Sequence, residues 1–196
     1  MKRCFDLFIA SLIFIYSLPL FVLTSVLIRI FIGKGVLFKQ LRPGKNGNPF
    51  KLYKFRTMTN TKSTNGDLLP DDQRMTKLGS MIRNTSIDEL PQLVNVIKGD
   101  LSLVGPRPLL MDYLPLYNDE QRKRHNVKPG ITGWAQINGR NTITWNQKFK
   151  LDIWYVENQS FKLDLYILYK TFLKVVQKKD ISAKDHVTVE KFRGNN

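Results

Sequence analysis

The chain has very few of the residues that build disulfides and zinc sites. It contains one cysteine, Cys4, and two histidines, His125 and His186, which lie far apart without cysteine neighbours. A single cysteine excludes an internal disulfide, and isolated histidines argue against a structural zinc site. This composition fits a reducing compartment that faces the cytosol.

Acidic residues are also scarce. The 196-residue chain has 16 Asp and Glu against 31 Lys and Arg, which gives a formal net charge of +15. Such an excess implies an anionic partner, which is a nucleic acid, an anionic membrane surface or a phosphorylated substrate. The common phosphate-binding loops are missing, and so are the HExxH and GxSxG motifs of hydrolases. The length predicts one domain that is large enough to bury a core.

A long uncharged apolar segment lies near the N-terminus, from Leu7 to Ile28. At 1.5 Å per residue, a helix over this range reaches across a hydrocarbon core of about 30 Å. The segment is too long for a cleaved signal peptide and has no small-residue cleavage site before Arg29. A buried soluble helix is the other interpretation, but runs of this length usually indicate a membrane segment.

The residues around this segment make a simple span awkward. Basic residues lie on both sides, at positions 2, 3, 29 and 34, so the positive-inside rule draws both ends toward the cytoplasm. Pro19 lacks an N–H and clashes with the carbonyl of Ile15, which predicts a kink. Ser17 can bond a backbone group that the bend frees. A re-entrant hairpin and an ordinary kinked span both fit these residues.

Local patterns predict a helix-rich chain with one β-hairpin. Strand, turn and strand are expected over residues 36–55, where apolar residues flank a turn rich in Gly, Pro and Asn. Helices are expected over 76–82, 86–97, 109–125, 145–156 and 163–176, with Gly99 as the stop of the second. The last of these fits either a membrane surface or the core. Residues 59–72 and 128–134 are predicted loops, 101–104 a short extended segment, and the residues after 178 a polar tail.

Two adjacent carboxylates, Asp88 and Glu89, stand at the predicted start of a helix in this otherwise basic chain. Ser86 and Glu89 have the spacing of a capping box, in which Glu89 closes back onto the N–H of Ser86. Successive helical residues diverge by about 100°, so the two carboxylates would instead serve one site in separate roles. A helix cap and a nucleophile beside a metal ligand both remain open at this point.

Three arginines suit phosphate binding. Arg107 lies between Pro106 and Pro108, whose fixed φ angles reduce the entropy lost when a guanidinium is aimed. Arg83 comes shortly before the acid pair, and Arg140 lies on a predicted turn. Each also has a structural interpretation, as an exposed residue on a rigid turn or at a helix end.

Taken in order, these motifs resemble those of the bacterial sugar transferases, in particular the small monotopic phosphoglycosyl transferases. The similarity covers nearly the whole chain. It includes the apolar segment with Pro19, RPG at 42–44, YKFRTM at 53–58, DELPQ at 88–92, GPRP at 105–108, PGITGW at 129–134 and NGR at 138–140. Within the family, the chain is most similar to enzymes that begin bacterial protein glycosylation from a UDP-diacetamido sugar such as UDP-diacetylbacillosamine.

The resemblance implies transfer of a phosphosugar from a UDP-sugar, with an N-acetylated or diacetamido sugar expected, to undecaprenyl phosphate. UMP is released, and the route is ping-pong. Asp88 would be the nucleophile that carries the covalent phosphosugar, and Glu89 would bind Mg²⁺. The residues implied in contacts with phosphate or substrate are Arg83, Arg107, Arg140, Pro106 and Pro108.

Pro19 matches the family's helix-breaking proline, which favours the re-entrant hairpin. The family commonly has Ser immediately before that proline, whereas this chain has Leu18 there and Ser17 one position earlier. The detailed geometry of the hairpin therefore does not follow from the resemblance.

The expected fold class is α+β and predominantly helical. It has a re-entrant membrane helix hairpin broken at Pro19 over residues 1–35 and a catalytic domain over 36–180, with a small β-hairpin and interfacial amphipathic helices. A polar tail follows over 181–196. The expected location is the cytoplasmic face of the bacterial inner membrane, with anionic lipids and no nucleic acid as partners, and a homo-oligomer is left open. The competing class is a non-catalytic, membrane-anchored basic protein that binds anionic lipid or nucleic acid.

Overall fold

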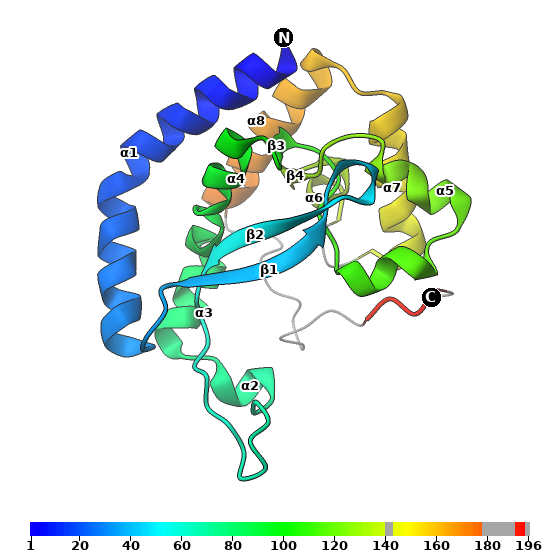
Figure 1. Ribbon diagram of the computed structural model, residues 1–196. Helices are drawn as coiled ribbons and strands as arrows, with labels where there is room; N and C mark the ends of the chain where they lie inside the picture. The colour runs from blue at the N-terminus through cyan, green and yellow to red at the C-terminus, as the bar shows by residue number, and fades with distance from the viewer. Residues whose placement is uncertain (140–142, 178–190, 195–196) are drawn as a thin grey trace.

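The computed structural model describes residues 1–139, 143–177 and 191–194. It is rich in helix, with two small two-stranded sheets. One long helix, α1, arches along one side of a body that contains all the other elements (Figure 1). This arrangement confirms the predicted helix-rich fold with a small hairpin and a long apolar N-terminal helix.

Helix α1 runs without interruption over Lys2–Phe31 and contains Pro19. Its axis bends along its length (Figure 1), but the chain does not fold into two separate helices. Pro19 removes one internal hydrogen bond, which accounts for a bend. The hydroxyl of Ser17 donates to the carbonyl of Phe14 at 3.0 Å rather than to Ile15, whose carbonyl the proline leaves without its helical partner.

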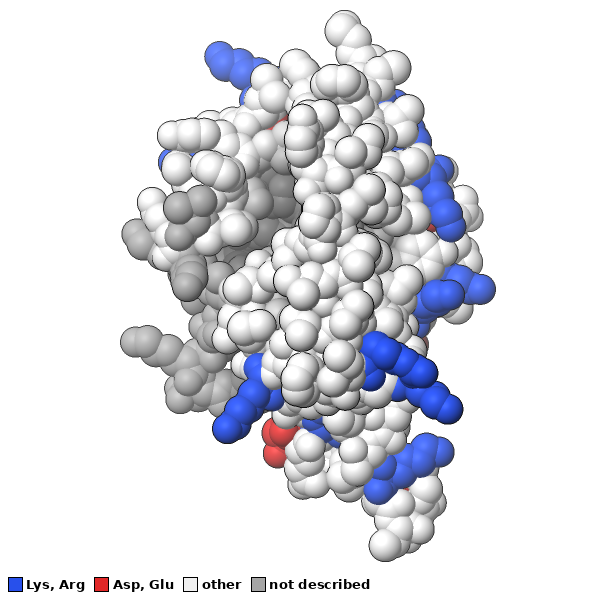
Figure 2. All heavy atoms as spheres, turned by 90° about the vertical axis from the view of Figure 1, so that its left-hand side faces the viewer, with Lys and Arg blue, Asp and Glu red and all other residues white. Residues whose placement is uncertain are grey.

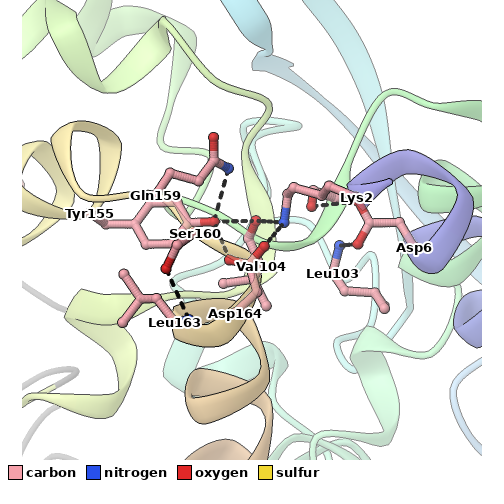
Figure 3. Close-up of polar contacts among 10 residues, drawn as sticks. Lys2, Asp6, Leu103, Val104, Tyr155, Gln159, Ser160, Leu163 and Asp164 are labelled. Carbon is pink, nitrogen blue, oxygen red and sulfur yellow. Dashed lines mark hydrogen bonds and ion pairs between the residues drawn. The ribbon is translucent and has the colours of Figure 1, made fainter.

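Polar contacts fix the first turns of α1 to the body (Figure 3). Asp6 is buried and accepts hydrogen bonds from the Ser102 hydroxyl at 2.7 Å and the Leu103 N–H at 3.4 Å. The ammonium of Lys2 lies 2.6 Å from the carboxylate of Asp164. Buried polar groups of this kind hold an orientation because each would lose its partner if the helix moved.

Apolar packing fixes the other end of α1. Ile28 and Ile32 are buried against Phe55 and Ile82 in one cluster. Between the two fixed ends, α1 leaves large apolar side chains exposed, namely Leu12, Ile13, Ile15, Tyr16, Leu18, Leu20, Val22, Leu23 and Val26. Among the described residues, α1 is the one helix that is long and apolar enough to cross a membrane.

The predicted hairpin is confirmed. Strand β1 (Leu37–Pro43) pairs antiparallel with β2 (Pro49–Phe55), with Leu37 opposite Phe55. The short turn η1 (Lys45–Gly47) joins them, and Asn46 and Gly47 adopt positive φ angles of 57° and 78°. Asn and Gly adopt positive φ angles at low cost, so these two residues allow the tight turn that closes the hairpin.

The middle of the chain forms several short helices. Helix α2 covers Asp71–Arg74, and α3 covers Lys77–Asn84, with the Thr76 hydroxyl accepting from the N–H of Gly79 at 2.9 Å as its N-cap. The predicted helix over 86–97 is instead two elements, the 3₁₀ turn η2 (Ile87–Glu89) and the helix α4 (Gln92–Lys98). Gly99, at φ 94°, ends α4 as predicted.

A second, parallel sheet joins segments far apart in the sequence. Strand β3 (Ser102–Val104) pairs with β4 (Gly130–Thr132), with Val104 opposite Thr132. A loop was predicted over 128–134, where β4 lies, because glycine and proline are typical of turns. The strand forms here because it pairs with β3, which is a tertiary contact. The expected helix over 109–125 is three short pieces, η3 (Met111–Leu116), α5 (Asp119–Arg122) and η4 (Lys123–His125), and Pro115 lies within η3.

The C-terminal helices pack on this sheet. They are α6 (Trp134–Ile137), α7 (Trp145–Glu157) and α8 (Phe161–Gln177), and the last two agree with prediction. The main core contains Val96, Leu101, Tyr155 and Ile167. Phe192, within the predicted polar tail, is 3% exposed and packs against Tyr113, Tyr117 and Phe149, so this aromatic residue belongs to a core.

Candidate active site

The acid pair lies on η2, between α3 and α4. Ser86 has a left-handed backbone, at φ 56° and ψ 16°, and its side chain makes no capping bond within the described part of the chain. The capping-box interpretation of this pattern is therefore wrong. The carboxylate of Glu89 turns instead toward cations from other segments, and Asp88, which is 7% exposed, does the same.

Lys54, on β2, connects the two carboxylates. Its Nζ lies 3.1 Å from Asp88 Oδ2 and 2.9 Å from Glu89 Oε1. The same Glu89 oxygen accepts from Nη2 of Arg107 at 2.8 Å. Two carboxylates and two cations thus form one partly buried cluster of charge-assisted hydrogen bonds.

The pKa values of the two carboxyl groups are shifted in opposite directions. Burial raises the pKa of Asp88 and the neighbouring Glu89 carboxylate adds to this, while the Lys54 ammonium between them opposes it. Burial also raises the pKa of Glu89, but the charges of Lys54 and Arg107 outweigh it and hold that pKa well below its usual range. Two carboxylates separated in this way suit two different chemical roles.

The backbone around Arg107 is rigidly held. The N–H of Gly105 donates to the carbonyl of Thr132 at 2.9 Å, and the carbonyl of Pro106 accepts from Gly130 at 3.0 Å. A Cβ on Gly105 would lie 2.4 Å from a backbone oxygen, so only glycine fits this close approach. Pro106 and Pro108 are both buried.

A buried ion pair supports the same loop. Nη2 of Arg124 lies 2.7 Å from Asp152 and donates to the carbonyl of Arg107 at 2.7 Å. The guanidinium of Arg107 is therefore positioned by its own backbone, with the two prolines as part of the frame. Pro106 and Pro108 are buried parts of this loop, and the carbonyl of Pro106 takes part in its hydrogen bonding.

Other cations lie near Arg107. Burial, followed by repulsion from Arg107, lowers the pKa of Arg42 to about 10. Burial lowers the pKa of Lys148 as well; Asp152 opposes this, and Arg107 adds to it. An anion that binds among these cations reduces their mutual repulsion. The region around Arg107 therefore suits phosphate groups.

A cavity of about 200 Å³ adjoins the cluster, and Ser86, Glu89 and Arg107 form part of its wall. Ile13 of α1 and Val175 of α8 lie on its other sides. The face that carries α1 is hollowed beside this helix (Figure 2). Glu89 and Arg107 therefore border an open cavity that lies next to the apolar helix α1.

Comparison with known proteins identifies the family. The family model described as "Bacterial sugar transferase" matches residues 1–178. The chain is 58% identical over 195 residues to the "Uncharacterized sugar transferase EpsL" of Bacillus subtilis (strain 168), which covers 100% of this chain and 96% of that protein. The chain belongs to the bacterial sugar transferase family. It is therefore an enzyme, and the competing prediction of a non-catalytic binding protein is wrong.

Relatives of this sugar transferase include two with named reactions. The "Undecaprenyl-phosphate galactose phosphotransferase" of Salmonella typhimurium is 38% identical over 197 residues, covering 92% of this chain and 41% of that protein. The "UDP-glucose:undecaprenyl-phosphate glucose-1-phosphate transferase" of Escherichia coli (strain K12) is 36% identical over 189 residues, covering 89% and 40%. This transferase spans about two fifths of the length of those two proteins.

The predicted arginines of the transferase fall in three different situations. Arg107 lies in the cluster, as described above. Nε of Arg83 donates to the hydroxyl of Thr57 at 2.9 Å, so its side chain is engaged by a neighbour outside the acid pair. Arg140 lies outside the described residues.

Lys54 was not among the predicted site residues. It belongs to the motif at 53–58, but it lies 34 positions from Asp88, and no local pattern predicts a contact across that separation. The sequence did offer one indication, because Lys54 is a cation within a motif that resembles one of the family. The strand β2 that carries it was predicted, while the contact required the tertiary structure.

The acid pair can accept a hard divalent cation only with help from other ligands. Carboxylate oxygens suit Mg²⁺, and Asp88 and Glu89 are adjacent. No group of three or more His, Cys, Asp or Glu within the described ranges is placed to hold a metal alone. The residues thus fit a metal that completes its ligands with water and substrate phosphate oxygens.

Proposed function

We propose that this sugar transferase moves a phosphosugar from a UDP-sugar to undecaprenyl phosphate and releases UMP. The observation that carries the proposal is the buried Asp88–Glu89 pair with Lys54 and Arg107 bonded to it. Two relatives named for undecaprenyl-phosphate sugar transfer support it. The proposed route is ping-pong, with one covalent intermediate on the enzyme.

In the first half-reaction, a carboxylate oxygen of Asp88 attacks the phosphorus that carries the sugar. A new bond forms between that oxygen and phosphorus, the bond from phosphorus to the bridging oxygen breaks, and UMP leaves with the electron pair. A carboxylate is a weak nucleophile toward a charged diphosphate, so Lys54 and Arg107 must offset the repulsion. Their contacts of 2.8–3.1 Å with the acid pair place them close enough to do this.

In the second half-reaction, a phosphate oxygen of undecaprenyl phosphate attacks the same phosphorus. The bond from phosphorus to Asp88 breaks, the free carboxylate returns, and the lipid carries a diphosphate sugar. The two half-reactions use one nucleophile in turn, so a water-soluble donor and a lipid acceptor do not need to bind together.

Mg²⁺ is the proposed cofactor, with Glu89 as its protein ligand. When bound, the ion would neutralise charge on the donor diphosphate. The lowered pKa of Glu89 keeps this carboxylate ionised at neutral pH, which a metal ligand requires.

We further propose that α1 is a re-entrant membrane anchor on the cytoplasmic face of the bacterial inner membrane. Both of its ends are fixed to the same body, through Asp6 and Lys2 at one end and Ile28 at the other. A helix held in this way cannot place its two ends on opposite sides of a bilayer, so its exposed apolar middle would enter and leave on one side. Lys and Arg gather near one end of α1 (Figure 2), where anionic lipid headgroups would meet them.

The proposal is tested with purified full-length protein, Mg²⁺, undecaprenyl phosphate and a panel of UDP-sugars that includes glucose, galactose, N-acetylated and diacetamido donors. We expect one or more donors to give UMP and a lipid-linked sugar. Asp88→Asn should reduce UMP release by at least about a thousandfold, because the amide cannot attack phosphorus. The control Asp67→Asn, on an exposed loop, should retain full activity. Full activity of Asp88→Asn with an unchanged melting temperature would refute the nucleophile assignment.

A further inference from the structure

The cavity beside the acid pair combines two kinds of wall. Most of its lining is apolar and comes from α1, α8 and the elements between them, namely Ile13, Leu90, Leu93, Ile131, Ile137 and Val175. Charged groups of the active site, Glu89 and Arg107, lie in the same lining. An apolar space that ends at a charged cluster fits a molecule with an apolar chain and an anionic head.

Gln136, on α6, is the unusual member of this lining. Both atoms of its carboxamide, Nε2 and Oε1, are buried and have no hydrogen-bond partner among the residues that the structure describes. A buried amide in a folded protein is normally bonded, and one without a partner is costly. An unsatisfied donor and acceptor on a cavity wall indicate a ligand that the cavity receives.

The surroundings of Gln136 hold its backbone in place. The indole of Trp134, two residues earlier, stacks on Trp154 with ring centroids 4.7 Å apart. A Cβ on Gly133 would lie 2.2 Å from the carbonyl oxygen of Gly105 and 2.8 Å from Gln136 Oε1. The absence of a side chain at Gly133 therefore lets α6 approach the loop that carries Arg107 and leaves room for the carboxamide.

The nearby hydroxyls do not satisfy this amide. Oγ1 of Thr132 and Oγ1 of Thr171 lie 2.7 Å apart and bond to each other, and Thr171 also donates to the carbonyl of Ile167 at 2.8 Å. Both hydroxyls line the cavity with Gln136. Because these hydroxyls bond to each other, the carboxamide of Gln136 is a polar group of this wall that can bind a ligand.

We propose that this cavity receives the phosphate end of the polyprenyl phosphate acceptor and that Gln136 binds that phosphate. This deepens the proposed function, on which it rests. The amide Nε2 would donate to a phosphate oxygen, beside the positive charge of Arg107, while the first isoprene unit lies against the apolar wall. The residue acts by binding and orienting the acceptor and takes no part in bond making.

The lining favours the lipid over the nucleotide donor. A ribose and a sugar would leave hydroxyl groups unpaired against the apolar wall, which costs free energy. An isoprene chain gains by burial there. The apolar surface continues outward along α8, where exposed side chains give a lipid a path from the membrane, namely Leu165, Tyr166, Tyr169, Phe172 and Val175.

Direct binding tests the proposal without any catalysis. Full-length protein in detergent micelles is titrated with undecaprenyl phosphate and with undecaprenol, and the tryptophan fluorescence is followed. We expect the phosphate to bind more tightly than the alcohol. Gln136→Met, which keeps size and removes both polar atoms, should weaken phosphate binding at least tenfold, and Gln136→Glu should weaken it further by repulsion. Gln73→Met, on exposed α2, is the matched control and should bind like the wild type.

Two results would overturn this assignment. One is equal affinity of Gln136→Met and the wild type for undecaprenyl phosphate, which would mean that the amide binds only water. The other is equal affinity of the wild type for the phosphate and the alcohol. Lipid binding that depends on Gln136 in a protein that releases no UMP would instead support this site and refute the proposed reaction.

Steady-state kinetics distinguishes a defect in acceptor binding from a defect in donor binding. In Gln136→Met we expect the KM for undecaprenyl phosphate to rise about tenfold, with the KM for the UDP-sugar and the UMP burst without acceptor unchanged. A purely structural defect would raise both KM values and would contradict the proposal. Val175→Trp, in the cavity wall, should raise the acceptor KM, whereas Lys162→Trp, exposed on the same helix and outside both the lining and the apolar path, should not.

Discussion

Lys54 links the two acids of the site, and its charge acts on both. Its ammonium lowers the pKa of Asp88 against the larger effect of burial, and it is the strongest attractive partner of Glu89. A nucleophilic carboxylate must be ionised, so Lys54 would keep Asp88, the proposed nucleophile, available for attack at lower pH. This role follows from its position between the two carboxylates rather than from any contact with the substrate.

Replacement of Lys54 by Met should therefore move the pH dependence of the reaction. The pKa of Asp88 is already raised by burial and rises further when the nearby cation is removed. The acidic limb of kcat/KM then shifts to higher pH, and the plateau activity falls by about 10- to 100-fold because charge stabilisation is lost. Lys62→Met, exposed on a loop, is the control and should keep the wild-type profile. An unchanged acidic limb in Lys54→Met would contradict the proposed coupling.

Among the secondary-structure elements, the attachment of the N-terminal end of α1 to the body depends on a buried polar network (Figure 3). Asp164 of α8 binds the ammonium of Lys2 at 2.6 Å and accepts from the hydroxyl of Tyr155 at 2.6 Å. Burial, then the hydrogen bond to Asp164, raises the pKa of Tyr155, so this hydroxyl remains a donor at neutral pH. One carboxylate therefore ties α1, α7 and α8 together.

Asp164→Ala should destabilise the protein, because the Lys2 ammonium and the Tyr155 hydroxyl would lose their shared carboxylate and keep the carbonyl of Val104 as acceptor. The loss should be about 2–3 kcal/mol, below the usual range for a buried pair because the Lys2 side chain is 29% exposed. The melting temperature in detergent should then fall by about 5–10 °C. Glu157→Ala removes an exposed contact at 3.9 Å and should change stability by no more than about 0.5 kcal/mol. Equal effects of the two substitutions would contradict the role of this network.

For the whole molecule, the arch of α1 is consistent with the proposed one-sided attachment to the membrane. Cys4 is the single cysteine of the chain and is exposed near the start of α1, so it reports the side on which the N-terminus lies. Asn65→Cys, in a Cys4→Ser background, places a second probe on an exposed loop of the body.

A membrane-impermeant maleimide should leave both cysteines unlabelled in intact spheroplasts and label both after permeabilisation, because the proposed anchor places both sites on the cytoplasmic side. Labelling of Cys4 alone from outside would show that α1 crosses the bilayer. That result would refute the re-entrant anchor while leaving the reaction itself unaffected.

Much of the fold follows from local signals. The turn around Asn46 and Gly47 closes the hairpin, Thr76 caps α3, and Gly99 ends α4, because each of these effects acts within a few residues. The capping pattern at Ser86 was one of two interpretations of this segment, and the structure does not form that cap. Glu89 gains more from two cations of distant segments than from one N–H at the helix start, so tertiary contacts override the local preference.

Periodicity, turn residues and motif order act locally along the chain, so the sequence alone predicts the long apolar helix, the hairpin, the long C-terminal helices and the acid pair. Only the tertiary structure brought Lys54 to Asp88, placed both ends of α1 on one body, paired β3 with β4 and left Gln136 unsatisfied in a cavity. The physical reason is that these contacts join segments distant in the sequence, and their energies depend on how the segments pack.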